Sequence, residues 1–289
     1  MKILLCTDGS SHASQGLNMG VRIAQRAASA VDILVVDERN REKKARQMAE
    51  AAAADLEADG IPVTIHRRTG QVAEELIHQA RTVPYDLAVI GSRGRRGIAR
   101  LMLGSVALHV SERAPVSVLV VKEDVRALER FLVCSSAGPV SAHTIQFAGR
   151  LAREINASVT LLHVMSQVPL AEDAFPDDLE ASAKELIQRK SREGIHLDQM
   201  LALLTAEGIA TRAVVRHGLV RDEIIAEGQE GRYDLLVIGT HVTPGLNSHL
   251  VNDLSADILL AADRPVLVVR YSQTEQDSHA TGDEWKAND

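Results

Sequence analysis

The sequence predicts an α/β fold made of two tandem domains, each a doubly wound parallel sheet of five strands. Apolar runs alternate with amphipathic segments along the chain, and the connections between them are short. The stretch at residues 85–91 (YDLAVIG) returns at residues 233–239 (YDLLVIG), which indicates an internal repeat. Aromatic residues make up only 2% of the 289 residues, so Val, Leu, Ile and Ala must fill the cores, as in parallel sheets covered by helices.

Each copy is expected to alternate five strands with four helices. In the first copy we expect strands at residues 2–6, 31–36, 62–67, 86–91 and 116–121. In the second copy we expect strands at residues 130–135, 158–164, 210–216, 234–239 and 265–270. Two further positions match between the copies, since Gly70 and Pro115 find counterparts in Gly218 and Pro265.

The first helix carries an apolar stripe at helical spacing, and a serine precedes it as a candidate cap. The cap is Ser10 or Ser11, and the stripe comprises Ala13, Leu17, Val21, Ala24 and Ala28. The second copy holds about twenty extra residues after its second strand, which lead into a long charged helix.

We expect domains at residues 1–124 and 128–271, followed by a polar, disordered tail at 272–289. The link between the domains has no Gly/Ser tract, so the domains should pack together. The net charge of −7 argues against nucleic acid as a partner, and no apolar run is long enough to span a membrane. Cys6 and Cys134 fall at matching positions inside separate sheets, which predicts reduced thiols in a cytoplasmic protein, although Cys6 has an alternative reactive role.

The most informative motif follows the apolar strand that ends at Ile90. Gly91, Gly94 and Gly104 recur at a spacing of Gly-x2-Gly-x9-Gly, and Ser105 begins the next helix together with Val106. Strand, glycine-rich loop and helix start are the parts of a phosphate cradle, because glycine lets the backbone approach an anion and the first helical turn offers free N–H groups. The alternative is that these are ordinary turn glycines.

A carboxylate converges on the same place. In an open parallel sheet, ligands bind at the carboxyl ends of the strands where the strand order reverses, and strands one and four should flank that crevice. Strand one ends in Thr7 and Asp8, so Asp8 faces the glycine loop, although it could serve only as a helix cap. Val36 closes strand two and offers backbone groups to a base. Arg93 and neighbouring arginines add positive charge, or simply form a solvated loop surface.

The chain resembles a tandem universal stress protein over about residues 1–271, on the glycine spacing, Ser105 and Asp8. The resemblance implies a Rossmann-like domain of the adenine nucleotide alpha hydrolase type that binds an adenine nucleotide, usually ATP, with ADP or AMP as alternatives. The glycine loop and Ser105 would hold phosphates, Asp8 the ribose or Mg²⁺, and the Val36 backbone the adenine. Thr7, Ile90, Arg93 and Val106 complete the expected site. The resemblance also implies that the final strands pair as a pseudo-dimer within one chain, and a homodimer is a further possibility.

The second copy departs from this pattern. Asp8 aligns with Ser136, Gly94 aligns with Val242, and residues 252–255 (NDLS) hold no glycine before Ser255. A β-branched residue in the loop blocks close backbone approach, and nearby aspartates would repel phosphate. We therefore expect one nucleotide per chain, in the first domain.

Three functions fit these observations. The leading one is a cytoplasmic ATP-binding protein in which the nucleotide regulates a stress response through conformation or an unidentified protein partner. The alternatives are a slow ATPase and a nucleotide-free scaffold whose second domain holds another ligand. No catalytic residue stands out, because no general base beyond Asp8 is placed near the phosphates and the Gly-Lys-Ser/Thr of a P-loop is absent.

Overall fold

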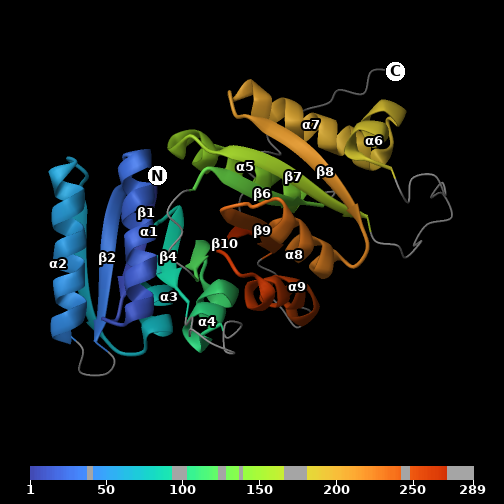
Figure 1. Ribbon diagram of the computed structural model, residues 1–289. Helices are drawn as coiled ribbons and strands as arrows, with labels where there is room; N and C mark the ends of the chain where they lie inside the picture. The colour runs from blue at the N-terminus through green and yellow to red at the C-terminus, as the bar shows by residue number, and fades with distance from the viewer. Residues whose placement is uncertain are drawn as a thin grey trace, which may run out of the picture.

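The computed structural model describes residues 1–37, 42–92, 103–122, 128–136, 139–165, 181–241 and 248–271. Within them, ten strands form one sheet in the order β3-β2-β1-β4-β5-β10-β9-β6-β7-β8. The predicted fold class is therefore confirmed, and the two five-stranded sheets are also joined edge to edge (Figure 1). None of the helices in these ranges is long and apolar enough to cross a membrane.

The elements of the first half begin and end close to the predicted positions. They are β1 (Lys2–Thr7), α1 (Ser11–Ala27), β2 (Ala30–Asp37), α2 (Glu42–Ala58), β3 (Val63–Thr69), α3 (Val72–Thr82), β4 (Leu87–Gly91), α4 (Ser105–Arg113) and β5 (Ser117–Val121). Ser10 is the cap of α1, because its Oγ accepts a hydrogen bond from the backbone N–H of Ala13 at 3.1 Å. Ala28, the last residue of the predicted stripe, lies just past α1 in a left-handed conformation with φ 45°.

The second half repeats this order with one added helix. Its elements are β6 (Arg130–Ser135), α5 (Pro139–Ile155), β7 (Ser158–Met165), α6 (Ala183–Arg189), α7 (Arg192–Ala206), β8 (Thr211–His217), α8 (Val220–Glu230), β9 (Leu235–His241), α9 (Ser248–Ala261) and β10 (Val266–Tyr271). The prediction of a single long helix after β7 is wrong, because α6 ends at Arg189, Lys190 follows it with φ 54°, and Ser191 caps a new helix. The predicted tail at 272–289 lies outside the described ranges.

The ladder pairings also correct the alignment of the two copies. Ala88 pairs with Val118, and its repeat counterpart Leu236 pairs with Val266. Val118 is therefore equivalent to Val266, and Pro265 corresponds to Ser117 rather than to Pro115. The same offset equates Gly104 with Asn252 and Ser105 with Asp253.

Helices cover both faces of the sheet, and each face carries an apolar cluster that runs through both halves. One cluster joins residues of α1, α2, α5 and α7 to the sheet and includes Leu119 and Leu267. The other joins α3, α4, α8 and α9 to the opposite face and includes Val118 and Val268. Burial of apolar surface therefore stabilises the junction of the halves as well as each half alone.

The junction itself is the antiparallel pairing of β5 with β10, in which Val120 lies opposite Val266 and Val118 opposite Val268. This pairing within one chain is the expected pseudo-dimer. Two buried cations reinforce it at matching positions. Lys122 donates from Nζ to the carbonyl of Ala262 at 2.6 Å, and Arg270 donates to the carbonyl of Ser111. Each cation thereby meets the C-terminal end of a helix from the other half, where the helix dipole favours positive charge.

Burial lowers the pKa of Lys122 to about 8 from an ordinary value of 10.5. Between these values the unfolded chain binds more protons than the folded chain, so this residue makes the free energy of unfolding rise with pH. We predict that the stability of the wild type relative to Lys122→Met increases by about 1–2 kcal/mol between pH 7 and about pH 9.5, measured by urea unfolding.

Arg270→Met is the matched control, because burial lowers the pKa of Arg270 only to about 10. Its stability difference from the wild type should change little over the same pH interval. An equal pH response of the two variants would contradict the assignment of this effect to Lys122.

Candidate functional site

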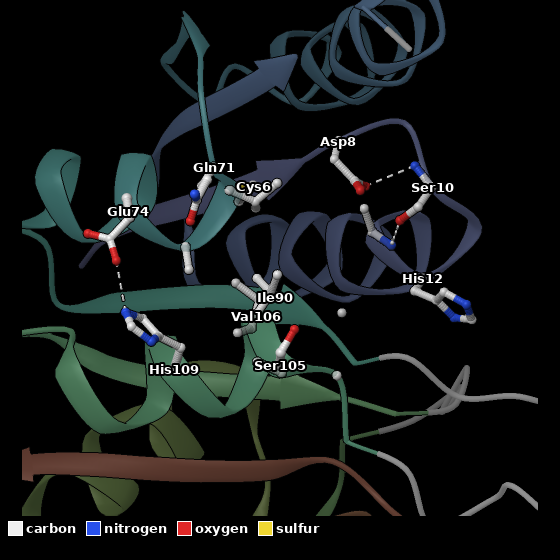
Figure 2. Close-up of a pocket in the computed structure, with 16 residues that line it drawn as sticks. Cys6, Asp8, Ser10, His12, Gln71, Glu74, Ile90, Ser105, Val106 and His109 are labelled. Atoms are coloured by element: carbon white, nitrogen blue, oxygen red, sulfur yellow. Dashed lines mark hydrogen bonds and ion pairs between the residues drawn. The ribbon is translucent and has the colours of Figure 1, made fainter. Parts of the chain in front are cut away.

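A cavity of roughly 290 Å³ opens at the carboxyl edge of the first half, where the strand order reverses between β1 and β4 (Figure 2). This is the place at which open α/β sheets bind ligands. Its walls come from the end of β1, the end of β4 and the first turns of α1, α3 and α4. The lining residues are Cys6, Asp8, Ser10, His12, Ala13, Gln71, Val72, Ala73, Glu74, Ile90, Gly91, Gly104, Ser105, Val106, Ala107 and His109.

The loop after β1 is held by short-range hydrogen bonds. Thr7 Oγ1 accepts from the N–H of Gly9 at 3.2 Å, and Asp8 Oδ1 accepts from the N–H of Ser10 at 2.9 Å. Gly9 has φ 75°, a left-handed conformation that glycine adopts without strain. Asp8 is thus not the side-chain cap of α1, which is Ser10, and it lines the cavity as a fixed carboxylate.

Gly91 and Gly104 are the motif glycines that the structure describes, and neither is needed for the predicted purpose of close backbone approach to an anion. A Cβ on Gly91 would lie 1.8 Å from the carbonyl oxygen of His12, so this glycine is needed for close packing of α1 on β4. Gly104 has φ −69° and ψ 147°, which any residue can adopt. Neither glycine has a positive φ, so neither is required by its backbone conformation, and Gly94 lies outside the described residues.

The N-terminus of α4 faces the cavity without an internal partner for its first amides. Gly104 is the N-cap and makes no side-chain cap, and no acidic residue occupies the first turn. The first backbone bond of the helix runs from Leu108 N–H to Gly104 O at 3.1 Å. The preceding N–H groups, at Ser105 to Ala107, therefore remain available, and with the helix dipole they favour an anion in the cavity.

The start of α3 forms a wall that the sequence reasoning missed. Gln71, Val72, Ala73 and Glu74 line the cavity because the β3–α3 connection ends at the same edge of the sheet as the other loops. The repeated glycine that precedes this helix, Gly70, was the available signal. Glu74 Oε1 lies 3.0 Å from His109 Nε2 of α4, so a carboxylate–imidazole contact joins α3 to α4 at the far end of the cavity (Figure 2).

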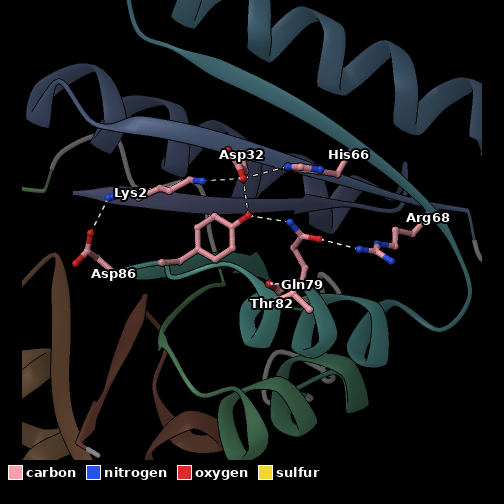
Figure 3. A network of polar contacts seen from close by, with 8 residues as sticks. Lys2, Asp32, His66, Arg68, Gln79, Thr82 and Asp86 are labelled. Carbon is pink, nitrogen blue, oxygen red and sulfur yellow. Dashed lines mark hydrogen bonds and ion pairs between the residues drawn. The ribbon is translucent and has the colours of Figure 1, made fainter. Parts of the chain in front are cut away.

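A polar network fixes the other end of α3 against the sheet (Figure 3). Tyr85 donates to Asp32 at 2.5 Å, and Gln79 of α3 donates to the Tyr85 hydroxyl at 2.9 Å. Lys2 and His66 also contact the Asp32 carboxylate, at 3.2 and 3.0 Å. Burial would raise the pKa of Asp32, but the hydrogen bonds from Tyr85, His66 and Lys2 outweigh it and lower that pKa. Asp32 therefore remains ionised and anchors the helix that walls the cavity.

The structure brings together most of the predicted site. Asp8, Gly104 and Ser105 line the cavity, as do three of the other predicted residues, Ile90, Gly91 and Val106. The side chains of Thr7 and Val36 are fully buried and do not line it.

Arg93 and Gly94 fall among the residues that the structure does not describe. Cys6 also lines the cavity, but burial, and secondarily the charge of Asp8, raise the pKa of its thiol. The thiol is therefore protonated at neutral pH, which disfavours the reactive role.

The equivalent edge of the second half lacks the exposed helix start. α9 begins at Ser248, five residues before Asp253, the counterpart of Ser105 (14 residues in α9 against 9 in α4). Backbone N–H groups at the position of the α4 N-terminus therefore lie inside a helix, where they bond to carbonyls one turn back. This arrangement removes the anion-binding feature of the first half.

Comparison with known proteins agrees with this architecture. The model of the universal stress protein family matches twice, over residues 1–122 and 128–270. The chain belongs to the universal stress protein family. Its two matches make it a tandem member, as the sequence predicts.

Three similar members illustrate the range of the family. Universal stress protein YxiE of Bacillus subtilis is 28% identical over 145 residues, covering 42% of this chain and 98% of that protein. A universal stress protein from Archaeoglobus fulgidus DSM 4304 has the same fold over 93% of this chain and 98% of its own, with a TM-score of 0.73 and 19% identity. Another, from Archaeoglobus fulgidus, was solved in complex with dAMP; it covers 50% of this chain and 98% of its own, with a TM-score of 0.35 and 16% identity.

We predict that alanine lowers the free energy of unfolding at Gly91 but leaves it nearly unchanged at Gly104. Gly91→Ala should lower the free energy of unfolding by about 1–3 kcal/mol, because the new Cβ meets the backbone of α1. Gly104→Ala should change it by less than about 0.5 kcal/mol, since its backbone conformation suits alanine. Urea unfolding of both variants checks this prediction. A Gly91→Ala protein as stable as Gly104→Ala and the wild type would show that Gly91 is not a packing glycine.

Tyr85→Phe should lower the free energy of unfolding by about 1–3 kcal/mol at pH 7. The reason is that Gln79, only 2% exposed, loses its acceptor and Asp32 loses a donor. Thr82→Val is the control, because the Thr82 hydroxyl donates only to carbonyls of its own helix. Urea unfolding compares the two variants. Equal stability of Tyr85→Phe and the wild type would show that the network does not anchor α3.

Proposed function

We propose that the first half binds one adenine nucleotide, ATP, in the cavity at the β1/β4 edge, and that binding regulates a stress response. The observation that carries this proposal is the open N-terminus of α4, which faces a cavity at the reversal point of the sheet. Such a helix start supplies N–H donors and a positive dipole for phosphate. Membership of the universal stress protein family supports the choice of an adenine nucleotide.

Within this proposal the residues take distinct roles. The N–H groups at the start of α4 and the hydroxyl of Ser105 hold phosphates, assisted by Gly94 and Arg93. Asp8 faces the ribose or a Mg²⁺ ion bound to the phosphates. One carboxylate together with phosphate oxygens is a suitable donor set for Mg²⁺, and the cavity offers Asp8 for that purpose. The backbone of Val36 remains the proposed contact for adenine.

The seam between the halves provides a route for regulation. α4 begins at the proposed phosphate site, and Arg270 of the second half holds the carbonyl of Ser111 near its other end. A nucleotide that fixes the start of α4 would therefore bias the packing of one half against the other. A protein partner or a second chain that reads this surface would sense the bound state.

Binding rather than turnover is the activity that we propose. Two alternative functions remain: an enzyme that slowly hydrolyses ATP, and a scaffold that binds no nucleotide. Asp8 and Glu74 are carboxylates of the cavity, but one oxygen of Asp8 accepts from Ser10 and Glu74 pairs with His109. The free thiols of Cys6 and Cys134 suit a reducing compartment, so we place this activity in the cytoplasm.

The first experiment is mass spectrometry of small molecules released when the purified protein is denatured, followed by titration of the emptied protein with ATP and Mg²⁺. We expect about one adenine nucleotide per chain, because in the described residues the open helix start of α4 has no counterpart in the second half. Absence of nucleotide together with no binding on titration would favour the scaffold. Release of labelled phosphate above the buffer rate would favour the ATPase.

Ser105→Asp tests the cradle, because it introduces the residue that the second half has at this position. We predict at least about tenfold weaker ATP binding by calorimetry, since the new carboxylate repels phosphate. The fold should persist, because an acidic residue in the first turn suits the helix dipole. Asp253→Ser is the matched control in the second half and should leave the affinity unchanged. Unaltered binding by Ser105→Asp would exclude the α4 start as the phosphate site.

A further inference from the structure

The second half has its own cavity, of about 220 Å³, at the edge equivalent to the proposed nucleotide site. It lies between the ends of β6 and β9 and the starts of α5, α8 and α9. Its walls are largely aliphatic, and besides Val140 and Leu254 the apolar lining residues include Leu162, Val164, Val220, Ile224, Ile238 and Ile258. The cavity therefore persists although the anion-binding helix start has been lost.

Large apolar side chains lie at the mouth of this cavity, at positions where the first half has polar or smaller side chains. Leu254 lines it in place of Val106 and is 40% exposed. Leu219, which directly precedes the lining residue Val220, replaces Gln71 and is 71% exposed. These are two of the four exposed large hydrophobic residues in the described part of the chain. Exposed apolar surface beside a cavity marks a binding site for an apolar ligand more often than a random surface does.

Four polar side chains of the cavity already bond to protein groups, those of Ser135, Ser141, Thr144 and His163. Thr144 donates to the carbonyl of Val140 at 2.7 Å, and Ser141 Oγ accepts from the N–H of Ser136 at 3.1 Å. His163 Nδ1 lies 3.1 Å from the carbonyl of Ser135. Burial lowers the pKa of His163, so the ring is neutral at pH 7. A charged ligand would lose its hydration here and gain few compensating hydrogen bonds.

The charges near the mouth also disfavour an anion. Asp222 and Asp257 occupy the positions that Glu74 and His109 hold in the first half, so the imidazole of that half is replaced by a second carboxylate. Asp257 is exposed. Asp222 pairs with Arg221 at 3.0 Å, whereas Asp257 replaces an imidazole with a carboxylate. Because like charges repel, this edge favours a phosphate or carboxylate ligand less than the first half does.

We infer that the cavity of the second half binds a small, uncharged, apolar molecule of about one to three fused aromatic rings or equivalent alkyl volume. An apolar cavity of about 150 Å³ is enough to hold benzene, and the volume here is larger and open to solvent. This assignment stands apart from the nucleotide proposal, because it rests only on residues of the second half.

The test uses the full-length protein and 1-aminoanthracene, a neutral fluorescent probe of about the right size. We expect saturable fluorescence enhancement in the wild type that excess ATP and Mg²⁺ do not displace. Val140→Trp should weaken probe binding at least about tenfold, because the indole fills the cavity that Val140 lines. His12→Trp places the same side chain at the equivalent position of the first cavity and should leave probe binding unchanged.

A second variant guards against misfolding of Val140→Trp. Leu254→Lys lies at an exposed position and should weaken the probe about threefold to tenfold through lost apolar contact. The inference is overturned if the wild type shows no saturable binding, if ATP displaces the probe, or if a folded Val140→Trp or Leu254→Lys protein binds as the wild type does. Loss of probe binding in His12→Trp with retention in Val140→Trp would place the probe in the first cavity and would also overturn it.

Discussion

The antiparallel pairing of β5 with β10 is the contact on which the rest of the molecule depends. It turns two five-stranded sheets into one and lets the apolar cluster on each face continue from one half into the other. Lys122 and Arg270 then place cations against helix ends across the seam. Because a buried charge without partners is costly, these contacts favour one register of the two halves over any other.

The two halves share the same fold but place the carboxyl group that anchors the third helix on different elements. In the first half the carboxylate beneath the third helix comes from the strand, as Asp32, and the helix supplies Gln79. In the second half Thr160 replaces Asp32 and the helix supplies the carboxylate, since Tyr233 donates to Glu227 at 2.7 Å. A tyrosine hydroxyl links helix and sheet in both cases. The cavity wall is therefore held in place although the carboxyl group comes from the strand in one half and from the helix in the other.

Much of the fold could be predicted because apolar runs locate buried strands regardless of their partners. The strand order and the position of Asp8, Ser105 and Ile90 at one edge follow from rules for parallel sheets. The wall formed by Gln71 and Glu74 had one signal in the sequence, the repeated glycine Gly70 before α3, but the contact of these residues with the cavity also depends on where α3 docks. The packing role of Gly91 could not be predicted, because it depends on a backbone contact between α1 and β4. The predicted equivalence of Pro115 and Pro265 was wrong, because only the strand pairings with β4 and β9 fix the register of the last strand in each half.

Joining two related halves in one chain has a consequence for how their cavities change over time. In a dimer of identical chains, a substitution in one cavity appears in the other, so a change that suits one ligand is imposed on both. Here each half is encoded separately, yet the seam holds the two together in a fixed ratio of one to one. Asn252 and Asp253 can therefore replace Gly104 and Ser105 in one half while the other half keeps its helix start open. Under the two binding proposals, the fused chain would respond to two chemically different molecules where a symmetric pair would respond twice to the same one.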